Sequence, residues 1–162
     1  MKKVTILLSK YCDPFSKLIA LSSGEYTHIS ISLDPEEKIF YSFNLKGFIE
    51  ENWENKKSKY LLPDRLRFYI YTDDETFEKL EKEINRFKER RNEIKYSVFG
   101  TILCFTRIPH NFKKEYFCSR FVAEVLTKSG AVKLKKKSSQ YLPMHIIKEL
   151  RPHLLKKKKG VV

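Results

Sequence analysis

Residues 26–45, YTHISISLDPEEKIFYSFNL, constrain the fold more than any other stretch of the sequence. From His28 to Leu33 polar and apolar residues alternate, which is the pattern of a β-strand with one polar and one apolar face. Residues 34–37 have the composition of a turn, and residues 38–44 are a second run of strand formers. The stretch therefore predicts an antiparallel hairpin whose polar face carries His28.

The rest of the chain adds further strands and helices to this hairpin. Residues 4–8 and 65–72 predict strands, while capping residues and helical spacing predict helices that begin after Asp13, after Thr72 or Asp73, at Cys118 and at Pro143. Residues 97–108 fit a buried helix or an irregular core segment, and residues 47–57 show no clear pattern. This order predicts one α+β domain over residues 1–150, with an antiparallel sheet packed against helices.

Positive charge is concentrated near the C-terminus. The formal net charge is +13, and residues 128–162 contribute +10 of it, from ten lysines and one arginine against the single acid Glu149. We expect residues 151–162 to form a basic tail, which either keeps the protein in solution or attracts a polyanion such as an anionic membrane surface. A nucleic acid is the less favoured partner, because the sequence contains no nucleic-acid-binding motif.

Hydropathy and cysteine content bear on location and cofactors. The sequence has no run of about 20 apolar residues, and the short apolar run at residues 4–8 is followed by Lys10 and Asp13, unlike a signal peptide. Three widely spaced cysteines without a CxxC pair disfavour both a disulfide framework and a structural zinc site. We therefore expect a cytoplasmic protein, with membrane association through the tail as an option, and neither a metal nor an organic cofactor.

Cys118 opens the stretch CSRFVAEVL, which has the apolar spacing of a buried helix. The commoner interpretation is that this cysteine packs in the core as a small hydrophobe. Its place in the first turn of a helix favours another interpretation, because unpaired backbone N–H groups and the positive end of the helix dipole stabilise a thiolate there. The same N–H groups would stabilise an oxyanion, so Cys118 is a candidate nucleophile.

A cysteine nucleophile normally works with a histidine base, and a third polar group orients that histidine. The sequence contains four histidines: His28, His110, His145 and His153. Only His28 lies on a predicted strand whose orientation is fixed by an apolar opposite face. We therefore take His28 as the candidate base, with an ordinary strand histidine as the alternative.

Asn44 is the candidate for the third polar group. A hairpin turn at the expected place puts Asn44 opposite His28, where its side chain accepts the imidazole N–H. Ser42 is the neighbouring alternative, and Glu50 is the carboxylate alternative if the chain folds back after Gly47. Asn44 is equally suited to form a turn before Gly47, so the choice among these residues stays open.

The segments YTHISISLD, FYSF and FCSRFVAEVLTKSG, in this order, resemble the circularly permuted branch of the papain-like NlpC-type superfamily. The similarity is greatest to the bacterial YiiX-like proteins, with lecithin retinol acyltransferase as a more distant relative, and covers roughly residues 17–130. It implies a permuted papain-like fold with Cys118 as nucleophile and His28 as general base. The third position of the family falls between Phe40 and Asn44, where relatives carry a histidine or another polar residue and this chain has no histidine.

The expected function is that of a cysteine-dependent hydrolase, such as an amidase or peptidase, or of an acyl transferase that forms an acyl-enzyme from an amide or ester. The resemblance implies peptide-like amides or lipid acyl groups as substrates. Two other interpretations stay open. The protein could bind a polyanion, an anionic lipid or nucleic acid, through its basic C-terminal segment without catalysis, or it could have a redox or metal role, which requires Cys12 or Cys104 close to Cys118.

Overall fold

The structure is a computed structural model that describes residues 1–106, 108 and 112–153. Its centre is a five-stranded antiparallel sheet with strand order β4-β3-β2-β1-β5. The strands are β1 (Lys2–Tyr11), β2 (His28–Ser32), β3 (Ile39–Asn44), β4 (Gly47–Asn52) and β5 (Leu61–Thr72). The predicted α+β class, with an antiparallel sheet packed against helices, is confirmed.

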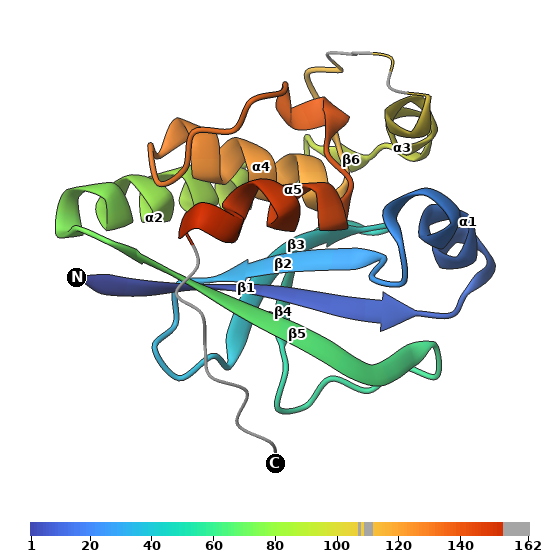
Figure 1. Cartoon of the computed structure of the whole chain (residues 1–162), viewed down its shortest axis with the longest axis horizontal. Coiled ribbons are helices and arrows are strands. Elements are labelled where there is room, and N and C mark those ends of the chain that lie inside the picture. The colour runs from blue at the N-terminus through green and yellow to red at the C-terminus, as the bar shows by residue number, and fades with distance from the viewer. Residues whose placement is uncertain (107, 109–111, 154–162) are drawn as a thin grey trace.

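The helices are α1 (Pro14–Ser23), α2 (Asp74–Glu89), α3 (Val98–Phe105), α4 (Cys118–Lys128) and α5 (Pro143–Leu150), with short 3-10 turns at Ser138–Gln140 and Arg151–His153. Two short strands, β6 (Lys95–Tyr96) and β7 (Glu115–Tyr116), pair in parallel. Figure 1 shows α2, α4 and α5 together on one side of the main sheet, with α1 at one end of it. None of the helices in the described part of the chain is both long and apolar enough to span a membrane.

The β2–β3 hairpin has the predicted register. Ile31 pairs with Tyr41, as expected for a turn centred in residues 34–37. The side chain of Asp34 forms this turn, because its carboxylate accepts the backbone N–H groups of Lys38 and Ile39 at 2.8 and 3.2 Å. These bonds fix where β3 begins, and the alternation of the strands then decides which side chains share a face.

The main core lies between the sheet and α4. Residues 118–126 of α4 are all buried, and the ring of Phe121 lies 5.5 Å from that of Phe43 on β3 and 4.9 Å from that of Phe87 on α2. Full burial of such a side chain contributes roughly 2–3 kcal/mol. These aromatic contacts hold the helix that begins at Cys118 in a fixed position against β2 and β3.

A smaller core lies on the opposite face of the sheet. It consists of Leu7, Phe40 and Trp53, with Leu61 packed against it, whereas Ile6, a neighbour of Leu7, belongs to the main core. The segment that joins the two edge strands β4 and β5, residues 53–60, runs along this face, because Trp53 packs there against Leu7 and Phe40. This path brings Trp53 and the following residues beneath the middle strands.

The sequence left two segments undecided, and the structure assigns both. Most of residues 97–108 form the helix α3, and residues 47–52 form β4. Strands β1 and β5 are longer than the apolar runs that predicted them, because they pair with each other over most of their length. The predicted basic tail lies outside the described residues except for the 3-10 turn Arg151–His153.

Candidate active site

Cys118 is the first residue of α4 and only 5% exposed. The residue before it, Phe117, occupies the N-cap position and has no side chain that could accept a hydrogen bond from the helix. The first-turn N–H groups of a helix have no partner within the helix itself. The thiol therefore lies beside backbone donors and the positive end of the helix dipole.

His28 is the first residue of β2, and its ring makes contacts on several sides. The ring interacts electrostatically with the thiol of Cys118, and its Nε2 atom lies 3.4 Å from Oε1 of Glu51, an ion-pair contact without hydrogen-bond geometry. The ring of Tyr11 packs against it edge-on, with the ring centres 5.5 Å apart. Because Nε2 faces Glu51, Nδ1 is the ring nitrogen left for the sulfur of Cys118. The structure thus brings together the predicted base and the predicted nucleophile.

Glu51 is the carboxylate beside this histidine. It is buried, 8% exposed, yet both of its oxygens have donors. The indole N–H of Trp53 donates to Oε2 at 3.2 Å, and the Nζ of Lys56 donates to Oε1. A buried carboxylate needs such partners to remain ionised. Trp53 and Lys56, which belong to the segment between β4 and β5, therefore hold the carboxylate of Glu51 beside the ring of His28.

The positive charge of His28 and the negative charge of Glu51 each stabilise the ionised form of the other residue. Burial alone would lower the pKa of His28, but the negative charge of Glu51 and hydrogen bonds to Cys118 and Glu51 raise it to about 9. Burial would likewise raise the pKa of Glu51, but the charges and hydrogen bonds of His28 and Lys56 lower it to about 2. At neutral pH the pair is consequently an imidazolium and a carboxylate.

The three side chains form a thiol–imidazole–carboxylate group. An imidazolium next to a thiol stabilises the thiolate, and the same ring can later give a proton to a leaving group. The carboxylate fixes the orientation of the ring through Nε2. Together with the backbone N–H groups of α4, this arrangement suits attack on a carbonyl carbon.

The residues predicted for the third position have other partners in the structure. The Oδ1 of Asn44 accepts the backbone N–H of Lys46 at 2.8 Å, in the turn that leads to β4. The hydroxyl of Ser42 donates to the carbonyl of Ile29 at 2.7 Å, and Glu50 pairs with Lys88 at 2.9 Å.

Glu51 was not among the residues predicted from the sequence. The adjacent Glu50 was the alternative if the chain folds back after Gly47, and the chain does fold back there as β4. Successive residues of a strand point to opposite faces, so only one of the two glutamates can turn toward His28. Recognising β4 as a strand with a definite register would have identified Glu51, and the sequence of residues 47–57 carries no such pattern.

The remaining cysteines are free thiols outside this group. Cys12 is half-buried, and Cys104 is buried in a cluster with Phe117 and Leu142. Burial, with a smaller effect from Cys118, raises the pKa of Cys104 to about 12, so its thiol stays protonated at neutral pH. Within residues 1–106, 108 and 112–153, no three or more His, Cys, Asp or Glu side chains gather in a way that could hold a metal ion.

Of the other histidines, His145 lies on α5 and has interactions of its own. His153 ends the 3-10 turn after α5, and His110 lies outside the described residues.

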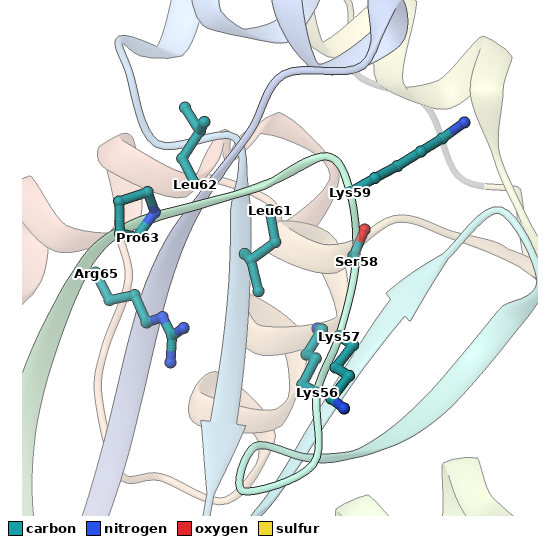
Figure 2. Close-up of a pocket in the computed structure, with 8 residues that line it drawn as sticks. All are labelled: Lys56, Lys57, Ser58, Lys59, Leu61, Leu62, Pro63 and Arg65. Carbon is teal, nitrogen blue, oxygen red and sulfur yellow. The ribbon is translucent and has the colours of Figure 1, made fainter.

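A cationic pocket of about 570 Å³ adjoins the site (Figure 2). Its lining combines four basic side chains with an apolar wall and one serine: Lys56, Lys57, Lys59, Arg65, Leu61, Leu62, Pro63 and Ser58. The Nζ of Lys56 lies 4.2 Å from the ring centre of Trp53, and the guanidinium of Arg65 lies 4.8 Å from it. Because Lys56 also bonds Glu51, this lysine connects the pocket to the thiol–imidazole–carboxylate group.

No protein-family model matches this chain, and no curated protein matches its sequence significantly. The chemistry of Cys118, His28 and Glu51 is therefore the basis for a function.

Proposed function

We propose that the protein is a cysteine-dependent hydrolase or acyl transferase with Cys118 as nucleophile, His28 as proton carrier and Glu51 as the residue that orients His28. The observation that carries this proposal is the position of the buried His28 ring, which interacts electrostatically with Cys118 and forms an ion pair with Glu51. Burying a charged pair is costly and contributes little net stability. Because the pair also contacts a thiol at a helix N-terminus, a role in catalysis explains it better than a contribution to stability does.

In the first half of the reaction the Cys118 thiolate attacks the carbonyl carbon of an amide or ester. The carbonyl electrons move to oxygen, and backbone N–H groups in the first turn of α4 stabilise that oxyanion. As the tetrahedral intermediate collapses, the carbon–nitrogen or carbon–oxygen bond breaks and the His28 imidazolium gives its proton to the leaving group. The product is a thioester on Cys118 and a neutral His28.

In the second half, neutral His28 accepts a proton from water or from another acceptor as this nucleophile attacks the thioester. The sulfur–carbon bond then breaks, the acyl group leaves on the new nucleophile, and Cys118 returns as a thiolate next to an imidazolium. The charge of Glu51 favours this final state, because it stabilises the positive ring. Hydrolysis and acyl transfer differ only in which nucleophile reaches the thioester.

The permuted papain-like fold is part of the same proposal. It is supported by the order of the elements, because the strand that carries His28 precedes the helix that begins at Cys118. That helix packs against β2 and β3 through Phe121 and its neighbours. The third residue comes from β4 here, one strand further along the chain than the resemblance implied.

The proposed substrate is a peptide-like amide or a lipid acyl group. The pocket that Lys56 connects to the site favours a substrate that also carries a negative charge, because Lys57, Lys59 and Arg65 line it with charges that Glu51 does not neutralise. The alternative function is polyanion binding without catalysis through the basic C-terminal segment, to which ten lysines and one arginine of residues 128–162 contribute. It predicts salt-sensitive binding that is indifferent to Cys118→Ala.

Alkylation by iodoacetamide, followed by mass spectrometry of each cysteine, tests the proposal. We expect Cys118 to react faster than Cys12 and Cys104 at pH 7, and His28→Ala to slow its reaction by roughly tenfold or more. The reaction of Cys12 in the same sample serves as the internal control and should not change. If Cys118 reacts no faster than Cys12, or if His28→Ala leaves its rate unchanged, the catalytic proposal is wrong.

A further inference from the structure

A second basic pocket, of about 450 Å³, lies between α2, α4 and residues 136–138. Seven basic side chains line it, against one acidic side chain, Glu124. These residues come from four separate parts of the chain. The charge is therefore a product of the fold and not of one lysine-rich run in the sequence.

The single carboxylate of this pocket is already neutralised. Arg86 donates to its Oε1 at 3.0 Å, Lys128 donates to the same oxygen at 2.7 Å, and the hydroxyl of Tyr116 donates to Oε2 at 2.9 Å. Glu124 does not pair five of the basic side chains: Arg90, Lys113, Arg120, Lys136 and Lys137. Arg90 is instead paired with Glu93 at 3.5 Å, so four of the five keep an unpaired charge.

Arg120 is the most informative of these five. It is only 3% exposed, and its Nη1 donates to the backbone carbonyls of Phe112 and Glu115 at 3.0 and 2.7 Å. Its guanidinium stacks over the ring of Tyr116, 4.4 Å from the ring centre. Its Nε is buried and, within the described residues, has no hydrogen-bond partner. Because backbone carbonyls and an aromatic ring hold the guanidinium in place, it supplies a fixed positive charge at the pocket that the described residues do not neutralise.

We propose that this pocket binds a compact anion that carries two or more phosphate groups. A single carboxylate would balance only one of the unpaired positive charges, whereas linked phosphates supply several charges within a small volume. Guanidinium groups form paired, charge-assisted hydrogen bonds with phosphate oxygens, and the volume falls in the range of small-molecule sites. The proposal does not depend on catalysis by Cys118.

Calorimetric titration of the full chain with inorganic tripolyphosphate tests this proposal. The informative variant is Lys136→Gln/Lys137→Gln, since both side chains line the pocket and are exposed, so folding is preserved. Its matched control is Lys133→Gln/Lys135→Gln, which removes the same charge from exposed positions of the same segment outside the pocket. We expect the pocket variant to weaken binding by roughly tenfold or more and the control by no more than about twofold.

Four results would overturn the proposal: no binding of tripolyphosphate, equal weakening by both double variants, tighter binding of citrate than of tripolyphosphate, or tighter binding of a long single-stranded oligonucleotide. The last result would show that the basic surface binds an extended polymer and not a compact anion. Vesicles that contain a phosphorylated inositol lipid identify the source of the phosphates. Binding to them, displaced by tripolyphosphate, supports a lipid headgroup, and tripolyphosphate binding without vesicle binding supports a soluble ligand.

Discussion

Nε2 of His28 lies 3.4 Å from Oε1 of Glu51, and this contact joins β2 to β4 across the intervening strand β3. Strands in a sheet are spaced about 4.8 Å apart, so the two backbones are separated by at least roughly 10 Å. The two side chains must extend toward each other over β3 to meet. The contact between these two side chains and Cys118 depends on the tertiary fold. Single substitutions at these residues and their neighbours should change the reactivity of Cys118 and the stability of the fold in distinct ways.

The first prediction concerns the charge of Glu51. Glu51→Gln keeps the size of the side chain and its acceptor for Trp53 but removes the charge that favours the His28 imidazolium. We expect the rate of Cys118 alkylation at pH 7 to fall by roughly tenfold to a hundredfold, as is typical when a carboxylate that orients a catalytic histidine is lost. Mass spectrometry of the alkylated peptides measures this rate.

Glu50→Gln is the matched control for that measurement. Glu50 is adjacent in sequence but pairs with Lys88 away from His28. Its neutralisation should change the alkylation rate of Cys118 by less than about twofold, since exposed ion pairs contribute little. Equal effects of the two substitutions would show that Glu51 affects Cys118 only through the net charge of the protein and not through its contact with His28.

The second prediction concerns stability as a function of pH. Despite burial, the charge of Glu51 raises the pKa of His28 from 6.5 to about 9, so the protonated ring stabilises the fold fully below pH 6.5, and this contribution is lost as the pH rises through 9. Despite burial, His28 lowers the pKa of Glu51 from 4.5 to about 2, so its contribution is present above pH 4.5 and is lost as the pH falls through 2.

The free energy of unfolding of wild type and Glu51→Gln should therefore differ most between pH 4.5 and 6.5. We expect a difference of about 3 kcal/mol there, which is the usual order for removing one partner of a buried ion pair. The difference should shrink as the pH rises toward 9. Urea unfolding followed by circular dichroism at a series of pH values measures it, and a difference that grows above pH 7 would contradict the assigned ion pair.

The third prediction separates the role of Lys56 from that of Glu51. Lys56→Met removes the Nζ that bonds Oε1 of Glu51 and preserves the packing of the side chain on Trp53. We expect a loss of about 2 kcal/mol in unfolding free energy at pH 7, the order of a hydrogen bond to a charged group. Alkylation of Cys118 should change by less than about threefold, because His28 and Glu51 remain paired.

Lys57→Met is the corresponding control, since Lys57 is exposed and lies in the same pocket wall. It should cost less than about 0.5 kcal/mol. The loss caused by Lys56→Met should also diminish toward pH 2, as Glu51 takes up its proton. A loss that is the same for both lysines, or that does not vary with pH, would show that Lys56 does not hold the carboxylate.

Local patterns predicted much of the fold. The alternation in residues 28–33 and the turn residues after it predicted the β2–β3 hairpin with its register, which the Ile31–Tyr41 pair confirms. Capping residues predicted the start of α5 at Pro143, and the position of Cys118 predicted the start of α4. Each of these signals acts between residues that are close in the chain, and short-range preferences suffice to determine it.

The partner of His28 could not be read from such patterns. Glu51 reaches His28 only because the segment after it crosses the second face of the sheet and places Trp53 and Lys56 around the carboxylate. This segment joins the two edge strands β4 and β5, whose positions are set by long-range pairing. Residues 47–57 have no periodic pattern of their own, so neither the strand β4 nor its register was predictable.

The fourth prediction tests Asn44 against Glu51 for the third position. Asn44→Ala removes the Oδ1 that accepts the backbone N–H of Lys46 in the turn before β4. We expect a loss of about 1 kcal/mol in unfolding free energy, the usual contribution of one hydrogen bond, and an alkylation rate of Cys118 within about twofold of wild type. Asn44→Asp restores an acceptor and should recover most of the stability. If Asn44→Ala instead slows alkylation as strongly as Glu51→Gln while the fold stays intact, Asn44 orients His28 and the role of Glu51 is limited to charge.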